Sequence, residues 1–391
     1  MFARFGFALA FSLVALAGAR AENRLVVEDT FLSVNIKGEP YRLQALVVKE
    51  AGANKKLPVV MITHGQAAEL EQREQVTPRA YQYLAREFAR RGWLAVVVVR
   101  RGFGHSEGKQ PYFVRGCENG NFGAILEDQA DDLEAAMQAI GRRHDADINE
   151  VVALGVSVGG GTVLSLGARN PAGLKAVINF SGGIKVVERP DLPPSTCKAE
   201  DLMTTFADFG SRSRVPSLWL YAENDSFFPA DYARRLHEAY VAKGGKTEFH
   251  MFEPVGKDGH DLIANLDGAL HWLPAMDNFL RANLLQTYEQ TAMDRAVRGM
   301  NDNFTVRRML AQYHGRPSEK AFAMSQSNGY IQFSYGGSDI EAVSKHALEK
   351  CAEGAKEPCR IVLRNFEVVK DAVAVQNAAL AKKEAAADAT P

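Results

Sequence analysis

The fold follows from one stretch of sequence, Val151-Val-Ala-Leu-Gly155-Val-Ser157-Val-Gly159-Gly-Gly161. Its apolar, β-branched opening predicts a buried parallel strand. The pattern Gly-x-Ser-x-Gly then predicts a sharp turn into a helix, with Ser157 held at the carboxyl end of the strand. The two glycines suit a turn that brings backbones too close for a Cβ. We predict that Ser157 is a nucleophile and that the Val158 N–H faces a developing oxyanion. The alternative is a glycine-rich turn with an incidental serine.

A serine nucleophile needs a base, and the base needs an acid that orients it. Two loops downstream supply both groups in the order acid, then base. The strand that ends at Tyr221 is followed by Asp225, and a later strand is followed by His260 in a glycine-flanked loop. Each gap leaves room for a strand–helix unit and a loop. We predict Asp225 as the acid and His260 as the base, with Glu223 as the alternative acid.

Other histidines are weaker candidates for the base. We expect His250 to lie inside a strand and His237 and His271 to lie on helices, where structural roles are commoner.

The second oxyanion donor should come from the loop after the strand 57–63, which reads His64-Gly65-Gln66. We predict the Gln66 N–H as this donor, with Ala67 as the alternative. His64 is expected to be structural in that turn.

Strands alternate with helices from residue 57 to residue 285, which predicts βαβ units with right-handed crossovers. Strands in 24–49, joined by a turn at 38–40, precede them. The predicted fold class is therefore α/β, with a mostly parallel sheet. Loops that follow its strands gather at one edge, where open α/β folds bind ligands.

Five motifs carry a resemblance to a known family. They are His64-Gly65, Arg101-Gly102-x-Gly104-x-Ser106-x-Gly108, Gly155-Val-Ser157-Val-Gly159-Gly160, Ala222-x-x-Asp225 and Gly259-His260. On these residues the chain resembles the α/β-hydrolase superfamily, and within it the dienelactone-hydrolase-like and prolyl-oligopeptidase-like serine hydrolases. The resemblance covers roughly residues 24–285. It implies a mostly parallel sheet with helices on both faces. Dienelactone hydrolases use a cysteine where this chain has a serine. The peptidases usually carry an N-terminal propeller, which we do not expect here because few residues of the predicted hydrolase domain precede its first core strand.

The beginning of the chain predicts export. A positive residue, an apolar run and Ala19-Arg20-Ala21 are typical of a secretory signal peptide over residues 1–21, cleaved after Ala21. We therefore expect a secreted or periplasmic protein. The formal net charge of −1 argues against nucleic acid as a partner. No later apolar run is long enough to span a bilayer. Without a CxxC pair or an HExxH motif, we expect no metal and no cofactor.

Four cysteines in an exported chain suggest two disulfides, which allow three pairings. We expect Cys117 to join Cys197 and so fasten a small cap, residues 184–214, to the sheet; separate buried thiols are the alternative. We expect Cys351 to join Cys359, because a small unit gains from a crosslink. We predict a hydrolase domain over residues 22–285 and a helical linker over 286–318. A small disulfide-bridged α/β module over 319–370 and a flexible tail over 371–391 follow.

The leading hypothesis is a serine hydrolase that cleaves carboxylic esters through an acyl-enzyme. Its substrate would be a small-molecule or polymeric ester, and the oligomeric state is open. An exported serine peptidase of the same fold is the first alternative, although no acidic pair that would recognise a peptide amino terminus can be placed. The second alternative is a non-catalytic binding protein on a hydrolase scaffold. The ordered Ser157, Asp225 and His260 favour an enzyme.

Overall fold

The computed structural model describes residues 24–53, 55–66, 71–109, 121–184 and 199–369. The predicted signal peptide, the predicted Cys117–Cys197 bridge and the predicted tail lie outside the described residues. The chain divides into two compact units, residues 1–219 with 231–249 and residues 220–230 with 250–391. Among the helices of the described ranges, none is long and apolar enough to cross a membrane.

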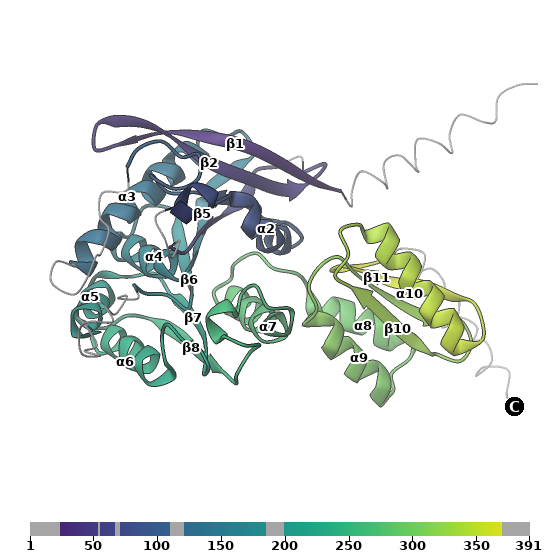
Figure 1. Cartoon of the computed structure of the whole chain (residues 1–391). Coiled ribbons are helices and arrows are strands. Elements are labelled where there is room, and N and C mark those ends of the chain that lie inside the picture. Colours follow the sequence, from purple (N-terminus) through teal and green to yellow (C-terminus); the bar gives the residue numbers. More distant parts are fainter. Residues whose placement is uncertain (1–23, 54, 67–70, 110–120, 185–198, 370–391) are drawn as a thin grey trace, which may run out of the picture. The chain divides into compact units, whose positions relative to one another are not determined.

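The main sheet has eight strands in the order β1-β2-β4-β3-β5-β6-β7-β8 (Figure 1). β1 and β2 form an antiparallel hairpin, and β2 pairs antiparallel with β4. From β4 through β3 and β5 to β6 the pairing is parallel, which confirms the predicted mostly parallel sheet. The strands are β1 Leu25–Ile36, β2 Glu39–Glu50, β3 Leu57–Thr63, β4 Leu94–Val98, β5 Ala146–Val156, β6 Leu174–Phe180, β7 Ser217–Ala222 and β8 Thr247–Phe252.

The strand order reverses at β3. The chain leaves β3 for β4 on one side, whereas β5 pairs with the other side. In open α/β sheets ligands bind at the carboxyl ends of the strands beside such a reversal. The loop that follows β3 and the turn that follows β5 therefore meet at the position where this kind of sheet places its ligand site.

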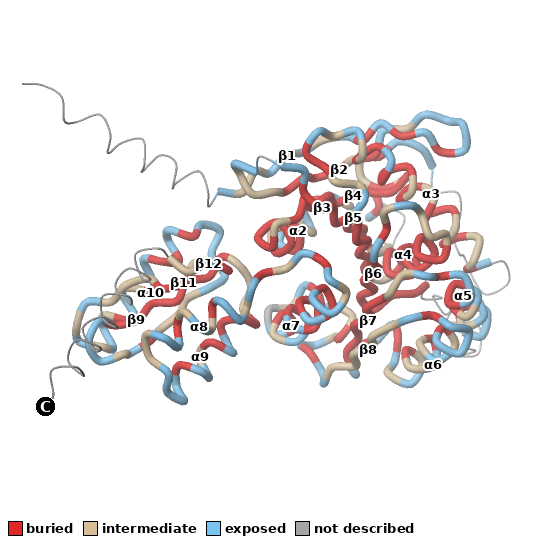
Figure 2. Tube along the Cα trace, turned by 180° about the vertical axis from the view of Figure 1, so that it is seen from behind, coloured by how far each residue is buried: buried red, intermediate tan, exposed pale blue. Residues whose placement is uncertain are grey.

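Helices cover both faces of the sheet in the first unit. α3 and α4 lie on one face and α2 on the other, and the central strands between them are buried (Figures 1 and 2). Strands covered on both faces need continuous apolar runs, which β3, β4 and β5 supply. The bounds are η1 Glu71–Gln75, η2 Pro78–Tyr81, α2 Gln82–Ala89, α3 Phe122–Ile140, α4 Val158–Arg169, α5 Ala199–Arg212 and α6 Ala230–Val241.

Helix α5 corrects part of the predicted cap over residues 184–214. Its Leu202, Phe206 and Phe209 follow helical spacing and are buried. The Phe206 ring packs edge-on against Trp219, with ring centroids 5.5 Å apart. α5 also contacts α3 and α4. Residues 199–212 are therefore a helix that flanks the sheet, because their apolar stripe is buried against its neighbours, and they do not form a cap.

The second unit contains a separate four-stranded antiparallel sheet in the order β10-β9-β11-β12. Helix α10 packs on three of its strands, β9, β10 and β11. The Cys351–Cys359 disulfide joins α10 to the start of β11, as predicted. The bounds are η3 Gly259–Asp261, α7 Leu266–Ala282, α8 Gln290–Met300, α9 Phe304–His314, β9 Lys320–Ser325, β10 Ile331–Tyr335, α10 Ile340–Ala355, β11 Cys359–Arg364 and β12 Glu367–Val368.

Helices α8 and α9 occupy the segment 286–318 that the sequence predicts as a linker. Both helices contribute to one hydrophobic core with the small sheet, through Val297 and Leu310 among others. The buried Lys320 ammonium donates to the carbonyls of Tyr313, His314 and Arg316 at the end of α9. These residues are therefore part of the small module instead of a connection to it. The domain boundary at residue 285 stays a prediction.

Candidate active site

Ser157 occupies the turn between β5 and α4, as the Gly-x-Ser-x-Gly pattern predicts. Its backbone has φ 55° and ψ −122°, a conformation that costs free energy for any residue with a Cβ. Backbone hydrogen bonds on both sides of the residue fix it there. The Ser157 N–H donates to Phe180 O at 2.9 Å, and Ser157 O accepts from Gly160 N at 2.8 Å and Gly183 N at 3.0 Å. Such strain at a serine marks a candidate functional position.

Close backbone packing explains the glycines around Ser157. A Cβ at Gly155 would lie 1.9 Å from Gly159 O, and a Cβ at Gly159 would lie 2.4 Å from His64 O. The loop after β3 reaches the serine itself, because a Cβ at Gly65 would lie 3.1 Å from the Ser157 Cβ. Both loops at the strand-order reversal therefore touch at Ser157.

His64 is held by the backbone through both ring nitrogens. Its Nε2 lies 3.1 Å from the Arg100 backbone nitrogen, which can only donate, so Nδ1 carries the ring proton. That Nδ1 donates to Gly65 O at 2.6 Å. Burial, together with the charge of Arg100, keeps the pKa of His64 well below its usual range. His64 is thus a neutral, fully engaged ring, in keeping with the structural role expected for it.

The predicted oxyanion donors lie on these same two loops. Val158 is the first residue of α4, where a helix N–H has no acceptor within the helix. The Gly65 N–H is occupied, since it faces the Tyr81 hydroxyl at 3.3 Å. Gln66 follows directly and stays the predicted second donor. The alternative donor, Ala67, lies outside the described residues.

The loops after β7 and β8 bring Asp225 and His260 together within the second unit. The His260 Nδ1 lies 3.1 Å from Asp225 Oδ1 and 3.2 Å from Oδ2. The Asp225 carboxylate is buried, and its Oδ1 also accepts from the Phe227 and Phe228 amides at 2.8 and 2.9 Å. Glu223, the alternative acid, is exposed. The acid that faces His260 is therefore Asp225.

Further contacts hold the loop of His260 and its imidazole in place. The Asp258 carboxylate accepts from the His260 backbone N–H at 2.9 Å and from the Ser226 hydroxyl at 2.6 Å, which ties the two loops together. The Phe227 ring stacks on the imidazole with centroids 4.2 Å apart. Because Nδ1 faces Asp225, Nε2 is the nitrogen that can exchange a proton. The sequence reasoning missed Phe227, since an exposed aromatic beside an acid carries no pattern of its own.

The three histidines that were weaker candidates for the base pack against aromatic rings. His250 and His271 both lie beside Phe252, with ring centroids 5.7 and 5.4 Å away. His237 stacks on Phe249 at 4.5 Å. These contacts agree with the structural roles expected for them.

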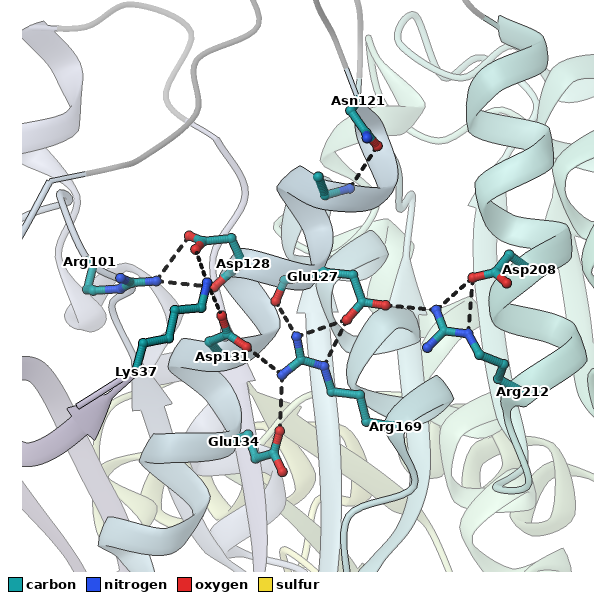
Figure 3. Close-up of polar contacts among 11 residues, drawn as sticks. Lys37, Arg101, Asn121, Glu127, Asp128, Asp131, Glu134, Arg169, Asp208 and Arg212 are labelled. Atoms are coloured by element: carbon teal, nitrogen blue, oxygen red, sulfur yellow. Dashed lines mark hydrogen bonds and ion pairs between the residues drawn. The ribbon is translucent and has the colours of Figure 1, made fainter. Parts of the chain in front are cut away.

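A network of ion pairs surrounds the acidic half of α3 (Figure 3). Arg101, in the loop after β4, binds Asp132 and also pairs with Asp128 at 3.0 Å. Burial raises the pKa of Asp132 to about 6, against the opposing effect of Arg101. Other cations bind the remaining carboxylates from separate elements: Lys37 of the β1–β2 turn, Arg169 of α4 and Arg212 of α5. The carboxylates on α3 thus anchor neighbouring elements, including the helix that follows Ser157.

No cluster of acidic, histidine or cysteine side chains suited to a metal ion occurs within the residues that the structure covers. Two residues near Ser157 that the sequence reasoning overlooked are Arg100 and Tyr81. Tyr81 matched an ordinary apolar helix position, and arginines are expected on surfaces. Neither Arg100 nor Tyr81 has a local sequence signal, because their contacts form only when the loops after β3 and β4 meet.

Comparisons with known proteins agree with this fold. Residues 55–209 match the model of a family described as serine aminopeptidase, S33. Similar solved structures include an acylaminoacyl peptidase (17% identity, 73% of this chain and 44% of that chain, TM-score 0.49) and an acetyl xylan esterase from Paenibacillus sp. R4 (16%, 70% and 94%, 0.44). A dienelactone hydrolase-like phosphotriesterase from metagenomic libraries is another (17%, 59% and 82%, 0.40).

A search of curated proteins found no match. The family match includes β3, β4, β5, the Ser157 turn and α4. The mostly parallel eight-stranded sheet and the strand–serine–helix turn give this chain an α/β-hydrolase fold, and its residues 55–209 are similar to the serine aminopeptidase family whose model they match.

Proposed function

We propose that the chain is an exported enzyme that cleaves carboxylic esters through an acyl-enzyme intermediate. Ser157 Oγ attacks the ester carbonyl, and His260 takes the hydroxyl proton and returns it to the leaving alcohol. Asp225 holds the imidazole in the required tautomer. The Val158 and Gln66 N–H groups bind the oxyanion. A water molecule, deprotonated by His260, then attacks the acyl-enzyme carbonyl, and the carboxylic acid leaves as Ser157 regains its proton.

The observation that carries this proposal is the pairing of His260 with a buried carboxylate through Nδ1. An imidazole held in this way presents Nε2 as a base, and the adjacent carboxylate stabilises the imidazolium that forms when it accepts a proton. The strained backbone of Ser157 supports the same assignment, because strain of this kind is retained where a side chain must be presented.

A serine aminopeptidase is the second candidate, and the description of the matched family favours it. Such an enzyme needs acidic side chains that bind a substrate ammonium group beside the scissile bond. Among the described carboxylates, those on α3 are paired with Lys37, Arg101, Arg169 or Arg212, so they are poorly suited to this task. The choice of an ester substrate rests on this difference.

A fluorophosphonate probe tests whether Ser157 is a nucleophile. We expect the wild-type protein to be labelled and Ser157→Ala to remain unlabelled. Ser165→Ala is the matched control, because Ser165 is buried on the same helix, and it should label as the wild type does. Absence of wild-type labelling would favour the non-catalytic binding protein instead.

Two substrate classes then separate esterase from peptidase. We expect kcat/KM for a p-nitrophenyl ester to exceed that for an aminoacyl p-nitroanilide. The reverse order would assign the chain to the peptidases. Export is tested separately, by the N-terminal sequence of the protein recovered outside the cytoplasm, which should begin at Glu22.

A further inference from the structure

Arg100, which follows β4, is a buried arginine whose recorded partners are all uncharged. Only 1% of the residue is exposed, and within the described residues its side chain makes no ion pair. Its guanidinium donates to Thr63 Oγ1 at 2.7 Å, to His64 O at 2.6 Å and to Gly65 O at 3.3 Å. Burial lowers the pKa of Arg100 to about 10. The charge of Asp132 offsets this burial only in part, and Asp132 makes no hydrogen bond to Arg100 among the described residues. Burying a guanidinium without a bonded carboxylate is costly, so its position calls for a role.

Arg100 fixes the direction of one particular peptide plane. Gly65 O accepts from Arg100 Nη2 and also from His64 Nδ1, so two donors hold this carbonyl. A trans peptide is planar, and its N–H points away from its C=O. The N–H in the same plane as Gly65 O belongs to Gln66. The direction of the Gln66 N–H is therefore set by Arg100 and His64.

Tyr81 fixes the preceding peptide plane. Its hydroxyl accepts from the Gly65 N–H at 3.3 Å. Gly65 directly precedes Gln66 in the loop beside Ser157, so this N–H is already engaged. Gly65 itself lies against the serine, because a Cβ placed there would be 3.7 Å from Ser157 Oγ. Arg100, His64 and Tyr81 thus hold both peptides around the residue that touches the candidate nucleophile.

We propose that Arg100 is a positioning residue, which clamps the Gly65–Gln66 peptide so that the Gln66 N–H stays aimed at the oxyanion. This inference rests on the proposed function. Arg100 does not touch substrate in this mechanism and acts through the peptide it holds. Because the oxyanion exists only in the transition state, losing the clamp should lower kcat and leave KM nearly unchanged.

The test uses the full-length protein with three substitutions. Arg100→Met removes the charge and all its donors. Arg100→Lys keeps the charge but replaces the guanidinium fork with one ammonium, which cannot hold all the same oxygens in that geometry. Arg91→Met is the matched control, because Arg91 is also buried in the first unit but bonds to Glu87 at the end of α2. The readouts are kcat and KM on a p-nitrophenyl ester, the Ki of a boronic acid that forms a tetrahedral adduct with serine, and a melting curve.

We expect Arg100→Met to lower kcat by about tenfold to a hundredfold, with KM changed by less than about twofold. The boronic acid should bind more weakly by a similar factor. Arg100→Lys should fall between the wild type and Arg100→Met, and Arg91→Met should lower the melting temperature without this loss of kcat. If Arg100→Met fails to fold, the split between kcat and KM in Arg100→Lys decides.

A folded Arg100 variant with wild-type kcat and boronic acid affinity would overturn the inference, as would a rise in KM at constant kcat. Failure of the proposed function would look different. The wild-type protein would then show neither fluorophosphonate labelling nor ester turnover before any Arg100 variant is compared.

Discussion

The Nδ1 atom of His260 faces both oxygens of the Asp225 carboxylate, at 3.1 and 3.2 Å. The Phe227 and Phe228 amides bind the same carboxylate, so its orientation does not depend on His260. A carboxylate held by backbone groups fixes the orientation of the imidazole, which is the arrangement that a histidine base requires.

Asp225→Asn should therefore lower kcat for ester hydrolysis by about 10³ to 10⁴, because an amide can favour the wrong tautomer of His260. The shape of the side chain is kept, so the melting temperature should change little. Glu223→Gln is the matched control on the same loop and should keep kcat within about twofold of the wild type. A larger loss in Glu223→Gln than in Asp225→Asn would exchange the two assignments.

Gly159→Ala should destabilise the fold severely. The new methyl group would lie 2.4 Å from the His64 carbonyl oxygen and 3.0 Å from Thr63 atoms, and both neighbours belong to the β3 end of the sheet. We expect a loss of at least about 3 kcal/mol in the free energy of unfolding, measured with urea. Gly123→Ala on α3 is the control, since its nearest neighbour lies 3.4 Å away, and it should change stability by less than about 1 kcal/mol.

Asp145→Asn should reduce stability in a pH-dependent way. Burial tends to raise the pKa of Asp145, but hydrogen bonds from Arg143 and Lys49 outweigh it and hold that pKa below its usual range. A depressed carboxyl pKa contributes stability above the unfolded pKa of about 3.9, and this contribution is lost as the pH falls through the folded pKa. We expect a loss of about 2 kcal/mol at neutral pH.

The difference between the wild type and Asp145→Asn should then shrink in urea unfolding below about pH 4. Asp231→Asn is the control, because the Asp231 side chain is fully exposed, and it should change stability by less than about 0.5 kcal/mol. A difference for Asp145→Asn that stays constant down to low pH would show that the lost charge is not the cause.

Replacing both Cys351 and Cys359 with serine should weaken the small module. The bridge closes a short loop between α10 and β11, for which chain entropy predicts a stabilisation of about 2 to 3 kcal/mol. The residues proposed for chemistry do not include this pair, so ester turnover should stay at the wild-type level while the module melts earlier. Loss of turnover without earlier melting would mean that the module helps to build the site.

The Ser157 turn and the contact between Asp225 and His260 could be predicted because each carries a local signal. Gly155 and Gly159 indicate a close backbone approach around Ser157, and the loops after the β7 and β8 segments hold an acid and a histidine in the expected order. The hairpin at 38–40 and the Cys351–Cys359 bridge were readable for the same reason, since a turn signal or a short cysteine spacing is itself local.

Features made by contacts across the chain could not be predicted. Arg100 has no sequence signature, because its role depends on oxygens contributed by the end of β3. Helix α5 was predicted as part of a cap because the prolines before it hid the apolar stripe that follows. The apolar residues of α8 and α9 are interspersed with arginine and glutamine, and they become core only because the small sheet supplies the other half.

The ion pairs around α3 differ in how strongly they are exposed to solvent. The Lys37 side chain is 63% exposed and that of Arg212 is 39% exposed, whereas Arg101 and Asp132 are at 9% and 3%. Dissolved ions weaken exposed pairs, since the screening length falls from about 10 Å at 0.1 M to about 3 Å at 1 M. A high salt concentration should therefore first break the ion pairs that join the β1–β2 turn and α5 to α3. The Arg101–Asp132 pair should persist at the same salt concentration, so the loop beside the candidate site stays in place. We therefore expect activity to be retained at salt concentrations that already break the exposed Lys37 and Arg212 pairs.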